Sequence, residues 1–249
     1  MALTLTEFLA QRANKGGNET ALIYEDKPVT YAALAAESRR VAQGLADLGV
    51  KAGDRVALWL PNVPAWLACF FACARLGAIA VTVNTRFKST EVADIVGRTG
   101  AKILVFWPDF RHIDFAGILR DVPHDALAHL ETLIAYDATD GDATPDPLLG
   151  RPVLRYRNLA QSEELSADHA RPDAGCVIFT TSGTTRAPKF VLHSQSSITR
   201  HAADMARGFG LDAPDAKTLL TVPLCGVFGL CNATATLAAS RPLVMMPTF

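Results

Sequence analysis

Apolar segments of two kinds alternate along much of this chain, and that alternation is the feature that most restricts its fold. Thr30 can cap an amphipathic helix that runs to about Leu48, and the short apolar run 55–60 follows. A second helix then begins after Pro64 and ends at Gly77, where another apolar run, 78–84, begins. Such alternation predicts an α/β fold, with mainly parallel sheets and helices on both faces.

The same pattern continues, with one interruption. Ser89 or Thr90 can cap a helix that ends near Gly100, and 101–107 is the next strand. Between about 108 and 170 the periodicity fades, and Asp, Pro and Gly are dense enough to indicate surface loop. Alternation resumes at Cys176. We therefore expect one α/β subdomain over 1–170 with flanking loops, and the start of a second over 171–249.

Composition excludes several classes of partner. The 249 residues carry a formal net charge of -1, and their Lys and Arg residues are scattered, so nothing indicates a nucleic-acid partner. The most apolar stretch, 64–83, is interrupted by Arg75 and Gly77, which argues against a membrane span. The five cysteines form no CxxC pair, no histidine pair has metal-ligand spacing, and the start has no secretory signal. Free buried thiols and a cytoplasmic location are expected.

The segment Cys176–Lys189 carries the chemistry. An apolar strand ends in hydroxyl side chains around Gly183, and Arg186 and Lys189 follow. Hydroxyls can donate to phosphate oxygens, glycine permits a turn of convergent backbone amides, and the cations add charge-assisted bonds. The alternative from composition alone is an ordinary polar turn between a strand and a helix. A Walker-type loop is excluded because Pro188 precedes the lysine and Phe190 follows it.

The stretch TTSGTTRAPKFV, residues 180–191, resembles the phosphate loop of the adenylate-forming superfamily, which includes acyl- and aryl-CoA synthetases. The segments 29–62, 72–87 and PLCGVFGL at 223–230 are similar to the same family. The resemblance implies that the β- and γ-phosphates of ATP are bound by one run of residues and a charged partner: Thr181, Ser182, Gly183, Thr184 and Thr185, with Lys189.

The resemblance also implies a reaction. A small carboxylic acid and ATP, usually with Mg²⁺, would give an acyl-adenylate and pyrophosphate, and CoA would then take the acyl group. By the same resemblance Gly226 and Phe228 would lie near the acyl pocket. The carboxylic acid, the thiol acceptor and the oligomeric state are left open.

The chain departs from the family pattern at several positions. Arg186 and Phe190 stand where the family usually has glycine, and Gly226 stands where CoA ligases commonly have histidine. The last residues, LVMMPTF, read as a buried strand, so we expect a cut through a domain. The family's later motifs are absent, and the chain alone is expected to be inactive. A non-catalytic nucleotide- or anion-binding module is the alternative, and a P-loop kinase or ATPase is disfavoured by the missing Walker pattern.

Overall fold

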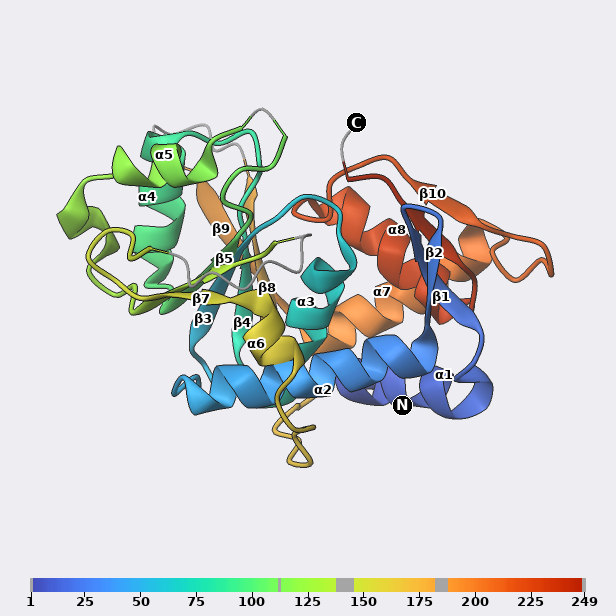
Figure 1. Cartoon of the computed structure of the whole chain (residues 1–249). Coiled ribbons are helices and arrows are strands. Elements are labelled where there is room, and N and C mark those ends of the chain that lie inside the picture. Colours follow the sequence, from blue (N-terminus) through green and yellow to red (C-terminus); the bar gives the residue numbers. More distant parts are fainter. Residues whose placement is uncertain (1, 112, 138–145, 182–187, 248–249) are drawn as a thin grey trace.

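Two β-sheets and the helices around them form the protein (Figure 1). The computed structural model describes residues 2–111, 113–137, 146–181 and 188–247. Its helices are α1 Leu5–Gly16, α2 Tyr31–Asp47, α3 Pro64–Leu76, α4 Ser89–Thr99, α5 Phe115–Arg120, the 3₁₀-helix η1 His124–Leu127, α6 Tyr156–Ala160, α7 Gln195–Gly208 and α8 Val227–Ala238. Its strands are β1 Thr20–Tyr24, β2 Lys27–Thr30, β3 Arg55–Trp59, β4 Ile79–Thr82, β5 Ile103–Phe106, β6 Thr132–Ala135, β7 Val153–Arg155, β8 Gly175–Thr181, β9 Lys189–Ser194, β10 Thr218–Leu220 and β11 Leu243–Met245.

The larger sheet has seven strands in the order β7-β6-β5-β3-β4-β8-β9. Every neighbouring pair is parallel except β8 and β9, which run antiparallel at one edge. Strand β3 lies at the centre of the sheet, and its Val56 is opposite Ala80 of β4 on one side and Ile103 of β5 on the other. Parallel strands need crossover connections, and the helices between them supply these connections.

Helices cover both faces of this sheet because its strands are apolar on both sides. Val56 and Leu58 of β3 belong to the core shared with α2 and α3, whereas Ala57 and Trp59 belong to the core shared with α4 and α5. Trp59 meets Phe115 of α5 edge to face, with ring centroids 4.4 Å apart. The near-continuous apolar runs are what burial on both faces requires. The predicted fold class is confirmed.

The smaller sheet has four strands in the order β10-β11-β1-β2. Leu22 of β1 pairs in parallel with Leu243 of β11, so segments from opposite ends of the chain lie side by side. Both sheets take strands from either side of residue 170, because β8 and β9 complete the larger sheet and β1 and β2 complete the smaller one. The division at residue 170 stays a prediction.

Helix ends follow the local sequence closely. The Thr30 hydroxyl accepts from the amide of Ala33 and begins α2 as predicted. Gly77 ends α3 and Gly100 ends α4, both in the left-handed conformation that glycine adopts without strain. The expected cap of α4 was wrong by one residue: Lys88 is the N-cap, and its amide donates to the Glu91 carboxylate.

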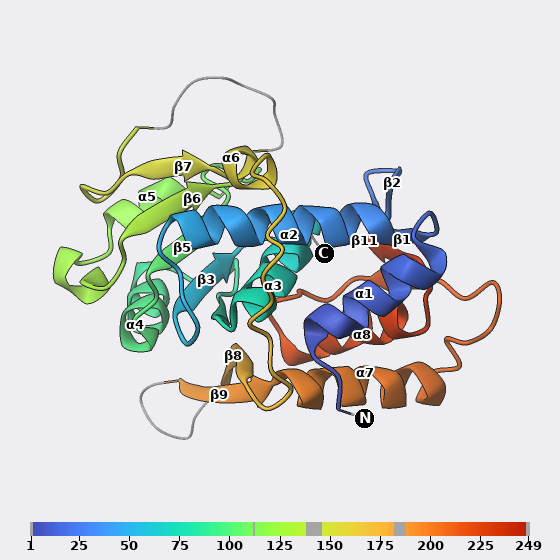
Figure 2. The same cartoon turned by 90° about the horizontal axis from the view of Figure 1, so that it is seen from below.

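The interval 108–170 contains more structure than its periodicity indicates. The strands β6 and β7 lie there and extend the larger sheet beyond β5. An extended segment then crosses α2 and α3 to reach β8 (Figure 2). Arginines hold this segment: Arg39 pairs with Glu164 at 2.6 Å, and Arg75 donates to the Leu165 carbonyl at 3.1 Å. The loop-like composition of 108–170 therefore gave no indication of the two short strands β6 and β7.

Among the described residues, no helix is both long enough and apolar enough to cross a lipid bilayer.

Candidate nucleotide site

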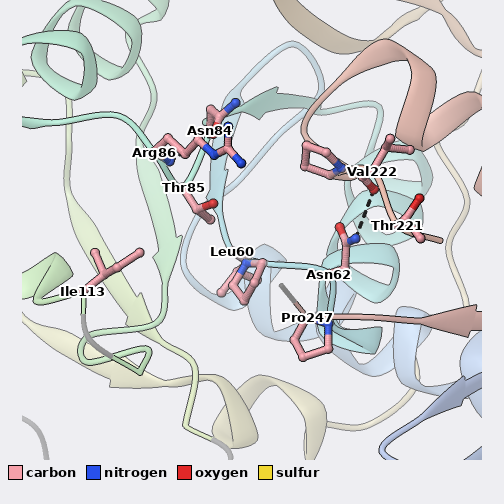
Figure 3. A pocket seen from close by; sticks show the side chains of 11 residues that line it. Leu60, Asn62, Asn84, Thr85, Arg86, Ile113, Thr221, Val222 and Pro247 are labelled. Atoms are coloured by element: carbon pink, nitrogen blue, oxygen red, sulfur yellow. Dashed lines mark hydrogen bonds between the residues drawn. The ribbon is translucent and has the colours of Figure 1, made fainter. Parts of the chain in front are cut away.

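A cleft of about 320 Å³ lies where the two sheets meet (Figure 3). It opens beyond the carboxyl ends of β3 and β4 in the larger sheet and of β10 and β11 in the smaller one. Its lining residues are Leu60, Pro61, Asn62, Asn84, Thr85, Arg86, Ile113, Thr221, Val222, Pro223 and Pro247. Ligands of open α/β sheets bind at this kind of position, in a crevice beyond the carboxyl ends of the strands.

Asn62 joins the two sheets at the floor of the cleft. It follows β3 and is buried. Its Nδ2 donates to the Val222 carbonyl at 3.0 Å, and its Oδ1 accepts from the Leu224 amide at 2.8 Å. One side chain therefore satisfies two backbone groups of the segment that follows β10.

A tight turn after β4 forms the opposite wall, where Figure 3 shows Asn84, Thr85 and Arg86 together. Trp59 Nε1 donates to the Asn84 carbonyl at 3.0 Å, and Asn84 Oδ1 accepts from the Arg86 amide at 2.9 Å. The Arg86 side chain is exposed, and within the described ranges no acidic group forms an ion pair with it. In the described part of the chain this wall therefore carries a positive charge without an acidic partner.

A buried thiol lies behind the same wall. Burial raises the pKa of Cys225 to about 11, and a hydrogen bond with the backbone of Thr85 opposes that rise. The thiol is protonated at neutral pH, so it is a packing group and not a nucleophile.

The predicted phosphate-binding residues are partly described. Thr181 ends β8 and Lys189 begins β9; both are exposed and lie directly opposite one another. Ser182, Gly183, Thr184 and Thr185, together with Arg186, lie outside the described residues. The segment connects two antiparallel strands, so its expected placement between a strand and a helix was wrong. The alternative of an ordinary polar turn falls outside the described residues.

The segment between β8 and β9 begins at Thr181, at the same edge of the sheet as the cleft. β8 is the parallel neighbour of β4, with Val81 opposite Ile178, and the Thr82 hydroxyl donates to the Ile178 carbonyl at 3.1 Å. The carboxyl ends of β4 and β8 therefore lie at the same edge of the sheet. β4 leads into the Asn84–Arg86 wall, and β8 leads to Thr181.

The predicted acyl-pocket residues lie at the start of α8. Gly226 is the N-cap, and its amide donates to the Pro223 carbonyl at 3.0 Å. Phe228 is 62% exposed. Pro223 lines the cleft, whereas Gly226 and Phe228 are not among its lining residues. Their role stays a prediction.

Asn62, Asn84 and Arg86 were not among the residues predicted from the sequence. Each follows an apolar strand within a few residues, and polar side chains at the carboxyl ends of parallel strands gather at one edge. That signal was present in the sequence. Within the described part of the chain, no group of three or more His, Cys, Asp or Glu side chains is arranged to hold a metal ion.

Comparison with known families decides the identity of this fold. The family model described as AMP-binding enzyme matches residues 9–249. The chain belongs to the AMP-binding enzyme family. It corresponds to the amino-terminal part of an adenylate-forming enzyme, as the resemblance implied.

Relatives within the AMP-binding family are CoA ligases. The long-chain-fatty-acid–CoA ligase FadD13 of Mycobacterium tuberculosis is 30% identical over 225 residues, which are 90% of this chain and 41% of that protein. The indoleacetate–CoA ligase of Aromatoleum aromaticum is 32% identical over 262 residues, covering 99% of this chain and 46% of that protein. The chain thus spans less than half the length of these two curated relatives.

Solved structures of CoA ligases share the fold. An anthranilate CoA ligase, AuaEII, in complex with anthranoyl-AMP superimposes with a TM-score of 0.85 at 24% identity, over 100% of this chain and 46% of that one. A putative long-chain-fatty-acid CoA ligase from Rhodopseudomonas palustris gives a TM-score of 0.80 at 25% identity, over 100% of this chain and 58% of that one.

Proposed function

We propose that this chain supplies the ATP-phosphate site of an AMP-forming acid–thiol ligase, an acyl- or aryl-CoA synthetase. One observation carries the proposal: Thr181 and Lys189 pair directly across two strands at the carboxyl edge of the sheet, the edge at which the cleft opens. A hydroxyl and an ammonium on two paired residues there suit phosphate oxygens. Ser182, Gly183, Thr184 and Thr185 complete the proposed set.

In the proposed reaction a carboxylate oxygen of the acid attacks the α-phosphorus of ATP. The bond from that phosphorus to the bridging oxygen breaks, and pyrophosphate leaves. Lys189 offsets the negative charge that builds on the leaving phosphates, and Thr181 donates a hydrogen bond to them. The acyl-adenylate then passes its acyl group to the thiol of CoA. These groups act mainly by positioning and by charge, as phosphoryl transfer requires.

Magnesium enters this scheme as part of the substrate MgATP. The described residues hold no cluster of acidic or imidazole ligands that would form a metal cage on its own. Mg²⁺ usually keeps several waters and binds through substrate phosphates with one or two carboxylates. The donor set of the cleft, amides and hydroxyls around one arginine, fits nucleotide phosphates better than a free cation.

Binding of MgATP to the full chain, measured by titration calorimetry, tests the phosphate site. Lys189→Met should weaken binding about tenfold, the loss of one charge-assisted hydrogen bond. Lys51→Met is the matched control, because Lys51 is exposed in the turn before β3, at the opposite edge of the sheet. Equal weakening in both variants would contradict the assignment of Lys189. Absence of MgATP binding to the wild-type chain would sink the proposed function.

Turnover is a separate question, because the chain spans less than half of its relatives. We propose that the isolated chain binds nucleotide without releasing pyrophosphate. A pyrophosphate-release assay with ATP, CoA and a panel of carboxylic acids tests this, and robust release from the chain alone would refute it. Nucleotide binding without release, in a protein of the relatives' full length, would instead favour the non-catalytic module.

We further propose an acyl pocket and a cellular compartment. Gly226 lies three residues beyond Pro223 of the cleft wall, and glycine leaves more room than the histidine that the resemblance places there, so the acyl pocket would extend toward Phe228. Gly226→His should then change the preference among acids more than the affinity for MgATP.

The five cysteines are free and buried, which suits the reducing cytoplasm. Cell fractionation tests that location.

A further inference from the structure

An arginine of α4 holds the strand that carries Lys189. The guanidinium carbon of Arg98 lies 4.5 Å from the ring centroid of Phe190, a cation–π distance. The same guanidinium donates through Nη1 to the Pro188 carbonyl at 3.2 Å. Asp94, one turn earlier in α4, pairs with Nη1 at 2.9 Å. Arg98 therefore contacts the residues on both sides of Lys189.

The alternation of side chains along β9 gives this contact a consequence. Phe190 pairs with Thr180 and packs on the core that contains α4, together with Ile178. Neighbouring side chains of a strand point to opposite faces. Lys189 and its partner Thr181 therefore share the other face with Phe179, which belongs to the core between the two sheets.

β9 needs an anchor because it is the edge strand of the sheet. It pairs with β8 alone, and Val191 and Leu192 are 38% and 55% exposed. A strand with weak burial is prone to slip in register, and a slip of one residue moves every side chain to the opposite face. Such a slip would carry Lys189 to the α4 side. The aromatic ring at residue 190 and the arginine beside it oppose that slip.

We propose that Arg98 and Phe190 act as a positioning pair that fixes the register of β9, and so holds the Lys189 ammonium on the face turned toward the second sheet to meet nucleotide phosphate. The proposal rests on the proposed function. The resemblance places glycine at the position of Phe190, and glycine would offer no ring to anchor. In this proposal Arg98 and Phe190 act only through the position of Lys189 and do not contact the substrate themselves.

Calorimetry with MgATP on the full chain tests the positioning role. Arg98→Met keeps the aliphatic stem and removes the guanidinium, and it should weaken binding about tenfold if Lys189 loses its position. Phe190→Ser should have a similar effect, whereas Phe190→Tyr keeps the ring and should retain affinity. Arg207→Met is the control, because Arg207 forms a comparable pair with Asp204 on α7. Affinity unchanged in Arg98→Met would overturn the proposal.

A double-mutant cycle separates positioning from a general loss of structure. If Arg98 acts through Lys189, then Arg98→Met in the Lys189→Met background should change affinity by less than about twofold. Independent effects that multiply in the double variant would contradict the role. Thermal unfolding of each variant shows whether the whole fold has weakened.

Amide hydrogen exchange tests the anchor without nucleotide, and so distinguishes its failure from failure of the proposed function. Amides of β9 should exchange faster in Arg98→Met than in Arg207→Met, because the edge strand opens more often. Equal exchange in the two variants would refute the positioning pair, even in a chain that binds MgATP. Faster exchange in a chain that binds no MgATP would support the anchoring of β9 by Arg98 and Phe190 but contradict the nucleotide-binding role of Lys189.

Discussion

The side-chain amide of Asn62 lies 3.0 Å from the carbonyl oxygen of Val222, so the end of β3 in one sheet is bonded directly to the segment that follows β10 in the other. The same amide also accepts from Leu224. The bond to Leu224 is buried and the bond to Val222 is partly buried, and both Asn62 and Val222 line the cleft. The geometry of the cleft therefore depends on one buried polar residue.

Asn62→Leu should lower the free energy of unfolding by about 2–4 kcal/mol, because two backbone groups lose their partner away from water. Urea denaturation measures this change. Asn232→Leu is the control, since among the described residues the Asn232 side chain bonds only to the carbonyl of Phe228 in its own helix, and its effect should stay within about 0.5 kcal/mol. Similar losses in both variants would contradict the bridging role.

Two glycines at the start of α8 should respond differently to added side chains. A β-carbon at Gly229 would lie 2.0 Å from the Pro223 carbonyl oxygen, whereas one at Gly226 would lie 3.4 Å from it. Gly229→Ala should cost about 1–3 kcal/mol by overpacking. Gly226→Ser should change stability by less than about 0.5 kcal/mol, because serine is a good N-cap. Chemical denaturation of both variants checks the contrast, which equal stabilities would contradict.

Gln195 should be a strong determinant of stability. It is fully buried, accepts from the Leu5 amide at 2.9 Å and donates to the Ala74 carbonyl at 3.0 Å, which joins α1, α3 and α7. Gln195→Ala should cost about 2–5 kcal/mol. The Gln195→Glu variant should be destabilised at neutral pH, where its carboxylate cannot donate to Ala74. Its stability should recover as pH falls toward about 4, because the protonated acid can donate to the Ala74 carbonyl. Parallel pH dependence in wild type and Gln195→Glu would refute this.

Alkaline pH should destabilise the protein through its buried thiols. Burial raises the pKa of both Cys73 and Cys176 to about 12. The unfolded chain loses these protons near pH 8.5, so the stability they provide is complete below that pH and is lost as pH rises toward the folded values. Each thiol should contribute a slope of about 1.4 kcal/mol per pH unit in that window.

Urea denaturation between pH 8 and 11 under reducing conditions measures that slope. Cys176→Ala should reduce it by the contribution of one thiol. An unchanged slope would contradict the burial of Cys176 as the cause.

Element type was predictable where periodicity was strong. The helix after Thr30 and the helix from Pro64 to Gly77 have a capping residue or proline at the start and glycine at or just past the end, and both form as expected. The strands β6 and β7 escaped prediction, because they are only four and three residues long and lie among loop-forming residues. Such short strands are specified by their neighbours in the sheet, which a local pattern does not contain.

The site was predictable in its chemistry but only partly in its geometry. The hydroxyls, glycine and lysine of the phosphate segment are visible in the sequence, whereas the pairing of Thr181 with Lys189 depends on β9. Its residues alternate poorly, since Val191 and Leu192 are adjacent and both exposed. An edge strand has little burial to impose a pattern. Asn62 and Asn84 line one cleft only because the parallel strands β3 and β4 end at the same edge of the sheet.

The pairing of Leu22 with Leu243 constrains the order in which the chain can fold during synthesis. The parallel partner of β1 is the last described strand, so β1 and β2 leave the ribosome long before it exists. Contacts of such sequence separation form slowly, because a long loop must close before they are gained. Until then the hairpin has no third strand to support it, and a two-stranded hairpin is marginal in water. Nascent chains stopped before residue 243 should therefore expose this hairpin to chaperones and proteases.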